Sequence, residues 1–104
     1  MLKGNKMSKE EYCKKAEELF KKKEFNEAIE CLNKVIELNP NRKEALGYYT
    51  KITICYCFLK EYDKAFDACN KRQKLKYKNE KKAEFFAKMY LFLIRILIAL
   101  KLIS

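Results

Sequence analysis

The chain has 104 residues, which is enough for one domain with a modest hydrophobic core. Two glycines and one proline leave little material for a β-rich fold, whereas the many Lys, Glu, Leu and Ala residues favour helices. The composition therefore predicts an all-α domain.

The strong positive charge bears on the class of partner. Lysine and arginine number 24 against 14 aspartates and glutamates, a formal net charge of +10. Only Arg42, Arg72 and Arg95 carry the planar guanidinium that reads phosphates and bases. The lysines are interspersed with glutamates, as on solvated helix faces, so we do not expect nucleic acid to be the partner.

The cysteines indicate a reducing compartment. Their number is odd, no CxxC spacing occurs and the chain has no histidine, which argues against a disulfide framework and a zinc site. The five are Cys13, Cys31, Cys55, Cys57 and Cys69. The segment 1–6 lacks the apolar core of a signal peptide. We expect buried thiols, no cofactor and a cytoplasmic protein.

Two helices are predicted in the first part of the chain, after a flexible N-terminus at residues 1–7. Ser8 and Glu11 have the spacing of a capping box, and apolar residues then recur at helical spacing to about Lys22. A second helix is expected from an N-cap at Asn26. It ends at 39–41, where Pro40 interrupts the hydrogen-bond ladder.

Two further helices and an apolar segment follow. The third helix is predicted over about 42–59, and the fourth over about 62–78, with Tyr62 and Asp63 repeating the signal of an aromatic residue and a cap. The last segment begins at 79 and is apolar on almost every side from 85 to 103. A helix of that kind must be covered by protein or lipid.

An internal repeat organises these segments. Residues 23–31 (KEFNEAIEC) and 60–68 (KEYDKAFDA) match at an offset of 37 residues, the separation of Ala28 and Ala65. Periods of this size indicate a helical solenoid, in which each unit buries its apolar face on its neighbour. Small alanines allow antiparallel helices to approach to roughly 8–10 Å between axes.

These residues resemble the tetratricopeptide (TPR) repeat, a helix-turn-helix unit of about 34 residues. The positions that match the first unit are Ala16, Phe25, Ala28 and Pro40, and those that match the second are Tyr49, Thr53, Tyr56, Tyr62 and Ala65. The resemblance implies a single domain over 8–104, made of repeats at 8–41 and 42–78 and a C-terminal helix at 79–104 that forms a partial third repeat. The second unit is most similar to the TPRs of immunophilins and other co-chaperones.

The resemblance also implies a function as a protein–protein interaction adaptor. TPR stacks usually bind a peptide or helix in a concave groove lined by the first helix of each unit. The groove residues expected here are Cys13, Phe20, Lys21, Thr50, Lys51, Ile54, Phe58, Lys81, Lys88 and Phe92. The lysines would favour acidic flanks on the partner. The alternative is that the apolar members only pack in the interior.

Co-chaperone TPRs clamp the terminal carboxylates of heat-shock proteins with lysines, asparagines and an arginine. Among those positions only Lys81 matches, whereas Cys13 replaces a lysine and Glu17 replaces an asparagine. Glu17 would repel a carboxylate, so we do not expect binding of heat-shock protein tails.

The apolar C-terminal helix leaves three interpretations open. It closes the domain while its far side meets a partner or a second copy, it lies on or inserts into a membrane, or the chain is a fragment whose continuation covers it. Arg95 opposes insertion by about 2.5–3.5 kcal/mol. The alternative function is therefore a self-associating, homodimeric or membrane-anchored structural module. Its self-association residues would be Leu91, Ile94, Leu97 and Ile98.

Catalysis is not expected. The chain has no histidine, no glycine-rich phosphate loop, no nucleophile elbow and no carboxylate pair in an apolar setting. The sequence therefore predicts a protein that is not an enzyme.

Overall fold

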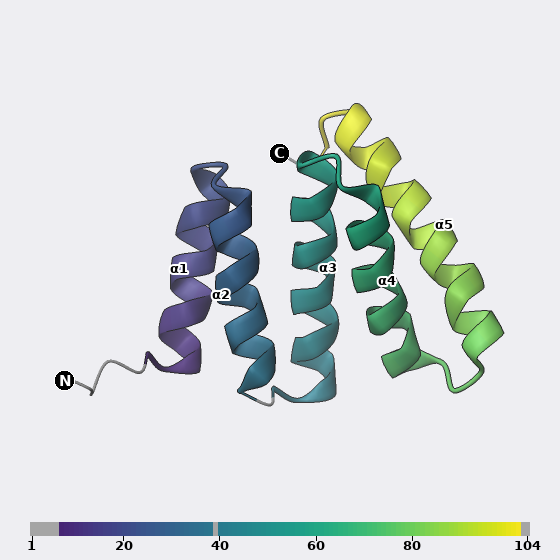
Figure 1. Ribbon diagram of the computed structural model, residues 1–104, viewed down its shortest axis with the longest axis horizontal. Coiled ribbons are helices and arrows are strands. Elements are labelled where there is room, and N and C mark those ends of the chain that lie inside the picture. Colours follow the sequence, from purple (N-terminus) through teal and green to yellow (C-terminus); the bar gives the residue numbers. More distant parts are fainter. Residues whose placement is uncertain (1–6, 39, 103–104) are drawn as a thin grey trace.

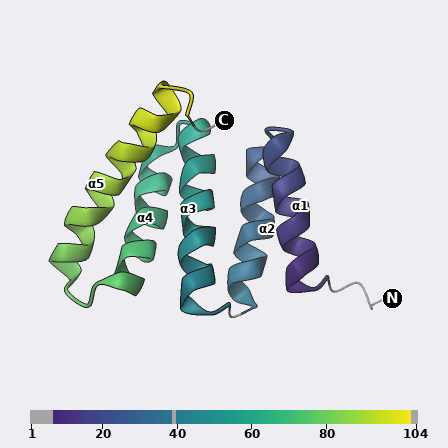
Figure 2. The same ribbon diagram turned by 180° about the vertical axis from the view of Figure 1, so that it is seen from behind.

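Five helices make up the part of the chain that the computed structural model describes, residues 7–38 and 40–102. They are α1 (Lys9–Lys21), α2 (Phe25–Glu37), α3 (Arg42–Phe58), α4 (Tyr62–Lys76) and α5 (Glu80–Ala99). The helices lie side by side in chain order and alternate in direction (Figures 1 and 2). The prediction of an all-α fold of TPR-like helix pairs is confirmed. Most of the predicted flexible N-terminus, residues 1–6, lies outside the described residues, as do Asn39 and residues 103–104.

Three helices begin at polar residues that cap them. The Ser8 hydroxyl accepts a hydrogen bond from the Glu11 amide at 3.1 Å, and the Glu11 carboxylate accepts one from the Ser8 amide at 2.8 Å. This is the predicted capping box. Asn41 and Glu44 form a second capping box at the start of α3, and the Asn79 side chain caps α5. Together they satisfy amides that the first turn of a helix leaves without partners.

The N-caps predicted at Asn26 and Asp63 are wrong. Helices α2 and α4 begin at the aromatic residues Phe25 and Tyr62. Their N-caps, Glu24 and Glu61, lie two residues before the predicted ones and make no side-chain hydrogen bond. The turn that precedes each helix sets its start, so no separate side-chain cap is used.

A left-handed lysine closes three of the helices. Lys23, Lys60 and Lys101 have φ of 64°, 60° and 60° after α1, α3 and α5. In each case the following amide donates to the carbonyl five residues before it at 2.9 Å. This is the hydrogen-bond pattern of a helix end with a left-handed residue, here formed without glycine. The first two of these turns lead directly into α2 and α4.

Small residues lie where the helices touch. Ala28 and Ala65 are completely buried and Ala16 nearly so, as the repeat predicts. The larger core cluster joins α1, α2 and α3 around Leu32 and Ile52, and α4 contributes one alanine to it. A second cluster joins α3, α4 and α5. Because α3 belongs to both clusters, it connects the two hairpins.

Helix α5 packs mainly on α4 and makes fewer contacts with α3. It runs without a break through residues 94–97, where a third repeat would need a turn. The expectation that the third repeat is only partial is consistent with this continuous helix.

Candidate peptide-binding groove

A hollow of about 270 Å³ lies between α1 and α3. Its lining is Ala16, Glu17, Phe20, Lys21, Leu32, Lys51 and Ile54. Four of these residues, Phe20, Lys21, Lys51 and Ile54, were predicted for the groove. The apolar residues form the floor, and the charged ones stand at the mouth, where the side chains are exposed.

One ion pair crosses the mouth of this hollow. The Lys51 ammonium lies 3.9 Å from the Glu17 carboxylate, and the two side chains are 50% and 61% exposed. An exposed pair at that distance contributes little, roughly 0–1 kcal/mol. An acidic group on a partner could therefore replace Glu17 at Lys51 at small cost.

A second ion pair fixes the other end of the same two helices. The Lys9 ammonium lies 3.2 Å from the Glu44 carboxylate, joining the start of α1 to the start of α3. Hydrogen bonds from the Asn41 amide and from Lys9 lower the pKa of Glu44. This contact was not predicted, and it adds a polar link between α1 and α3 to the apolar cluster that joins them.

Phe58, another predicted groove residue, is used for packing between repeats. Its ring stacks on Phe25 with centroids 4.9 Å apart, and Phe20 meets both rings edge-on at 5.5 and 6.2 Å. Aromatic pairs at these distances contribute about 0.5–1.5 kcal/mol beyond burial. We call Phe20, Phe25 and Phe58 the aromatic corner. Phe20 therefore belongs to both the corner and the hollow.

Cys13 and Thr50 make contacts within the protein. The Cys13 thiol donates a hydrogen bond to the Tyr48 hydroxyl at 3.3 Å. Thr50 accepts a hydrogen bond from Arg72 Nε at 2.8 Å, and its hydroxyl lies 3.0 Å from that of Tyr90. Thr50 thus ties α3 to α4 and α5, and neither residue lines the hollow.

The predicted groove residues on α5 do not reach this hollow either. Lys81, Lys88 and Phe92 are exposed, and none of them is part of its lining. Lys88 lies 3.6 Å from Glu84 on its own helix. Figure 1 shows α4 and α5 on the side of α3 away from α1. The structure therefore brings together only the α1 and α3 part of the expected groove.

The predicted self-association residues lie largely on the inner side of α5. Ile94 is 3% exposed and packs with Cys57 and Ala65, and the other three residues are half-buried. Ile94 is therefore a core residue, which corrects its predicted role. The exposed large apolar residues of α5 and of its C-cap form a stripe, the α5 stripe: Phe85, Met89, Phe92, Leu93, Ile96 and Leu100. Because the sequence of α5 is apolar on all sides, its periodicity could not indicate which face is buried and which is exposed.

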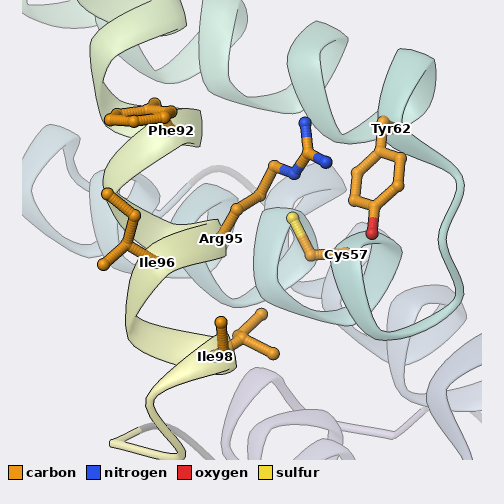
Figure 3. Close-up of a pocket in the computed structure, with 7 residues that line it drawn as sticks. Cys57, Tyr62, Phe92, Arg95, Ile96 and Ile98 are labelled. Atoms are coloured by element: carbon orange, nitrogen blue, oxygen red, sulfur yellow. The ribbon is translucent and has the colours of Figure 1, made fainter.

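A second hollow was missed by the sequence reasoning. It has about 420 Å³ and is lined mainly by α5, with Cys57 from the end of α3 and Tyr62 from the start of α4. The guanidinium carbon of Arg95 lies 4.1 Å from the centre of the Tyr62 ring, within cation–π distance. Figure 3 shows these two groups side by side, with the Cys57 sulfur pointing toward them. We call it the Arg95 hollow.

The buried thiols are neutral near pH 7. Burial raises the pKa of Cys55 to about 12 and that of Cys57 to about 11. The structure shows all five cysteines as free thiols. In the described ranges, no three histidine, cysteine or acidic side chains come together as a metal site would need.

Membrane insertion was one of the open interpretations of α5. Of the helices that the structure describes, none has both the length and the hydropathy needed to cross a bilayer.

Comparison with known families gives one match. Residues 10–42, which span α1, α2 and the turn between them, match the family model of the tetratricopeptide repeat. No curated protein and no solved structure matches the chain. The family match supports a tetratricopeptide repeat in the first helix pair, and the antiparallel packing of all five helices is consistent with a TPR-like helical repeat.

Proposed function

We propose that this protein is a non-catalytic adaptor that binds a segment of a partner protein in the hollow between α1 and α3. The observation that carries the proposal is the apolar floor at Phe20 and Ile54 under a charged mouth. Apolar pockets with a few placed polar groups are typical binding sites. The TPR match over residues 10–42, which include most of α1 but only the first residue of α3, supports an interaction role in general.

The partner segment that fits this hollow has an apolar anchor and acidic flanks. The anchor would fill the floor, and the flanks would meet Lys21 and Lys51. Charges at such a rim mostly raise the association rate and select partners. Binding of heat-shock protein tails is not proposed, because Cys13 and Glu17 stand where the clamp needs a lysine and an asparagine. The likeness of the second unit to co-chaperone TPRs stays a prediction.

We place the adaptor in the cytoplasm. This location is supported by the five cysteines, which are all free thiols in a chain of only 104 residues. Four of them are buried. Reducing compartments keep such thiols unpaired.

Selection from a random peptide library on the intact protein tests the groove. Selected peptides should combine an apolar anchor with acidic flanks. In the variant Lys51→Glu their affinity should fall roughly fivefold, near the upper end for an exposed ion pair. Lys34→Glu on α2 is the matched control, because Lys34 is 57% exposed and lies 3.8 Å from Glu37, much like Lys51 and Glu17.

Two outcomes would contradict the groove. One is a library that yields no enriched sequence. The other is an affinity that falls equally in Lys51→Glu and Lys34→Glu, since a general effect of the net charge would then explain the binding.

The α5 stripe supports a second candidate, self-association of the chain. Met89 is 52% exposed and Phe92 66% exposed, and with Phe85 and Ile96 they follow the four-three spacing of a helix–helix seam. Light scattering of the intact chain should then show a concentration-dependent dimer that Met89→Lys removes. Leu75→Lys on α4 is the control, since Leu75 is 37% exposed and lies outside the stripe. A monomer at every concentration would exclude this function, and flotation with liposomes would test whether the stripe meets lipid instead.

A further inference from the structure

The Arg95 hollow lies at a junction that corresponds to the aromatic corner. Adding the repeat offset of 37 residues to Phe20, Phe25 and Phe58 gives Cys57, Tyr62 and Arg95. In the first junction three rings fill the corner between helix pairs. In the second junction, the Arg95 guanidinium covers the Tyr62 ring, and Cys57 occupies the position equivalent to Phe20.

The two junctions differ in what lies beside the covered ring. Phe20 meets the other two rings of its corner edge-on, whereas the shorter Cys57 side chain lines part of a hollow of about 420 Å³. The remaining lining is largely apolar and includes Phe92, Ile96 and Ile98. The hollow shares no residue with the α1–α3 groove.

The charge of Arg95 bears on which ligand the hollow can bind. Over residues 7–38 and 40–102 no ion pair joins Arg95 to a carboxylate. The nearby Cys57 thiol stays protonated near pH 7, since burial raises its pKa to about 11. Arg95 is exposed, so its guanidinium can donate to an incoming anion while its face rests on Tyr62.

We propose that the Arg95 hollow is a second binding site, which takes a partner peptide through a large apolar side chain next to a carboxylate. The apolar side chain lies against the apolar lining of the hollow, beside Ile98. The carboxylate accepts hydrogen bonds from the guanidinium of Arg95. Arginine suits this role better than lysine, because its planar fork can bind a carboxylate with two parallel hydrogen bonds.

The volume of the hollow suits a short part of a peptide. Ligand pockets run from roughly 300 to 1,000 Å³, so about 420 Å³ is near the lower end and suits one or two side chains.

The proposal does not depend on the α1–α3 groove, because either site could bind without the other.

Three capped dipeptides test the site by NMR titration of the intact protein. Acetyl-Phe-Asp-amide carries both groups, acetyl-Phe-Asn-amide lacks the charge, and acetyl-Ala-Asp-amide lacks the ring. Acetyl-Phe-Asp-amide should shift the amides of residues 92–99 and the Arg95 Nε–H signal. Its affinity should be about tenfold higher than that of each of the other two. Acetyl-Phe-Asn-amide lacks the charged hydrogen bond, and acetyl-Ala-Asp-amide lacks the ring contact.

Matched variants separate the site from general charge attraction. Arg95→Gln should abolish the preference for Asp over Asn, read from the amides of Tyr62 and Ile98. Lys88→Gln removes the same charge from the same helix and should leave that preference intact. Both side chains are exposed, so both variants should fold.

Several results would overturn the proposal. These are equal affinity for the Asp and Asn dipeptides, an equal loss in Arg95→Gln and Lys88→Gln, or no shifts at residues 92–99 at the solubility limit of the probe. Shifts caused by phosphatidylserine vesicles but not by the dipeptide would assign the surface to lipid. None of these results would bear on the α1–α3 groove, which is tested separately by the effect of Lys51→Glu on peptide affinity.

Discussion

Enlarging a buried alanine at a hairpin contact should destabilise the fold in both repeats. Ala28 and Ala65 are 0% exposed, so the three extra carbons of leucine have no free space to enter. Overpacking of this kind costs typically 1–3 kcal/mol. A domain of this size has a total stability of roughly 5–15 kcal/mol. Ala28→Leu and Ala65→Leu should therefore each lower it by about 2 kcal/mol, and Tm by roughly 8–16 °C.

Thermal and urea unfolding followed by circular dichroism would measure this effect. Ala99→Leu is the control, because Ala99 is exposed at the end of α5 and its substitution should change the free energy of unfolding by less than about 0.5 kcal/mol. If either buried variant kept the stability of the parent chain, close approach at the alanines would not hold the helix pairs together. If only one variant were destabilised, the two hairpins would not be equivalent.

Three further predictions concern stability. Asn79→Ala should cost about 1 kcal/mol in urea unfolding, because the Asn79 side chain caps α5. Thr50→Val should cost about 1–3 kcal/mol by leaving Arg72 Nε and the Tyr90 hydroxyl without their partner, and it should leave peptide affinity unchanged. Burial raises the pKa of Cys55 from 9.0 to about 12, so the free energy of unfolding should fall as pH rises above about 9, by at most about 1.4 kcal/mol per pH unit. That slope should be smaller in Cys55→Ala, measured by urea unfolding across the same pH range.

The helices and their contacts could be predicted because they depend on local pattern. Ser8 was identified as a cap from residue type and from its spacing to Glu11, and it caps α1 in the structure. Ala28 and Ala65 were identified from the repeat, and both are fully buried. In each case a short stretch of sequence contains the whole physical reason.

The turns within the hairpins could not be predicted in the same way. Asn26 and Asp63 are good capping residues, but the chain enters α2 and α4 before reaching them. Lys23 and Lys60 adopt left-handed conformations, which favour glycine or asparagine. The backbone hydrogen bonds of the turn and the packing of the aromatic residue after it outweigh this preference, and neither is visible in residue type.

The candidate site was predicted only where two consecutive first helices meet. Lys21, Lys51 and Ile54 line the hollow, since α1 and α3 have the expected register. Thr50 was placed on the same surface but turns toward α4 and α5, because Arg72 offers it a hydrogen bond. The orientation of Thr50 thus depends on a side-chain contact with a residue far away in the sequence. On α5 the lack of polar residues removed the signal that separates an inner face from an outer one.

The two junctions place different chemical groups at equivalent positions of the fold. Phe25 and Tyr62 each begin the second helix of a pair, and each needs a group to cover its ring. Phe58 covers the first ring and leaves a corner filled by apolar packing. Arg95 covers the second and keeps its hydrogen-bond donors available at the rim of a hollow. At equivalent positions of the two junctions, one ring is thus covered by another ring and the other by a guanidinium. The choice between them decides whether the corner only stabilises the fold or also presents a charge to a partner.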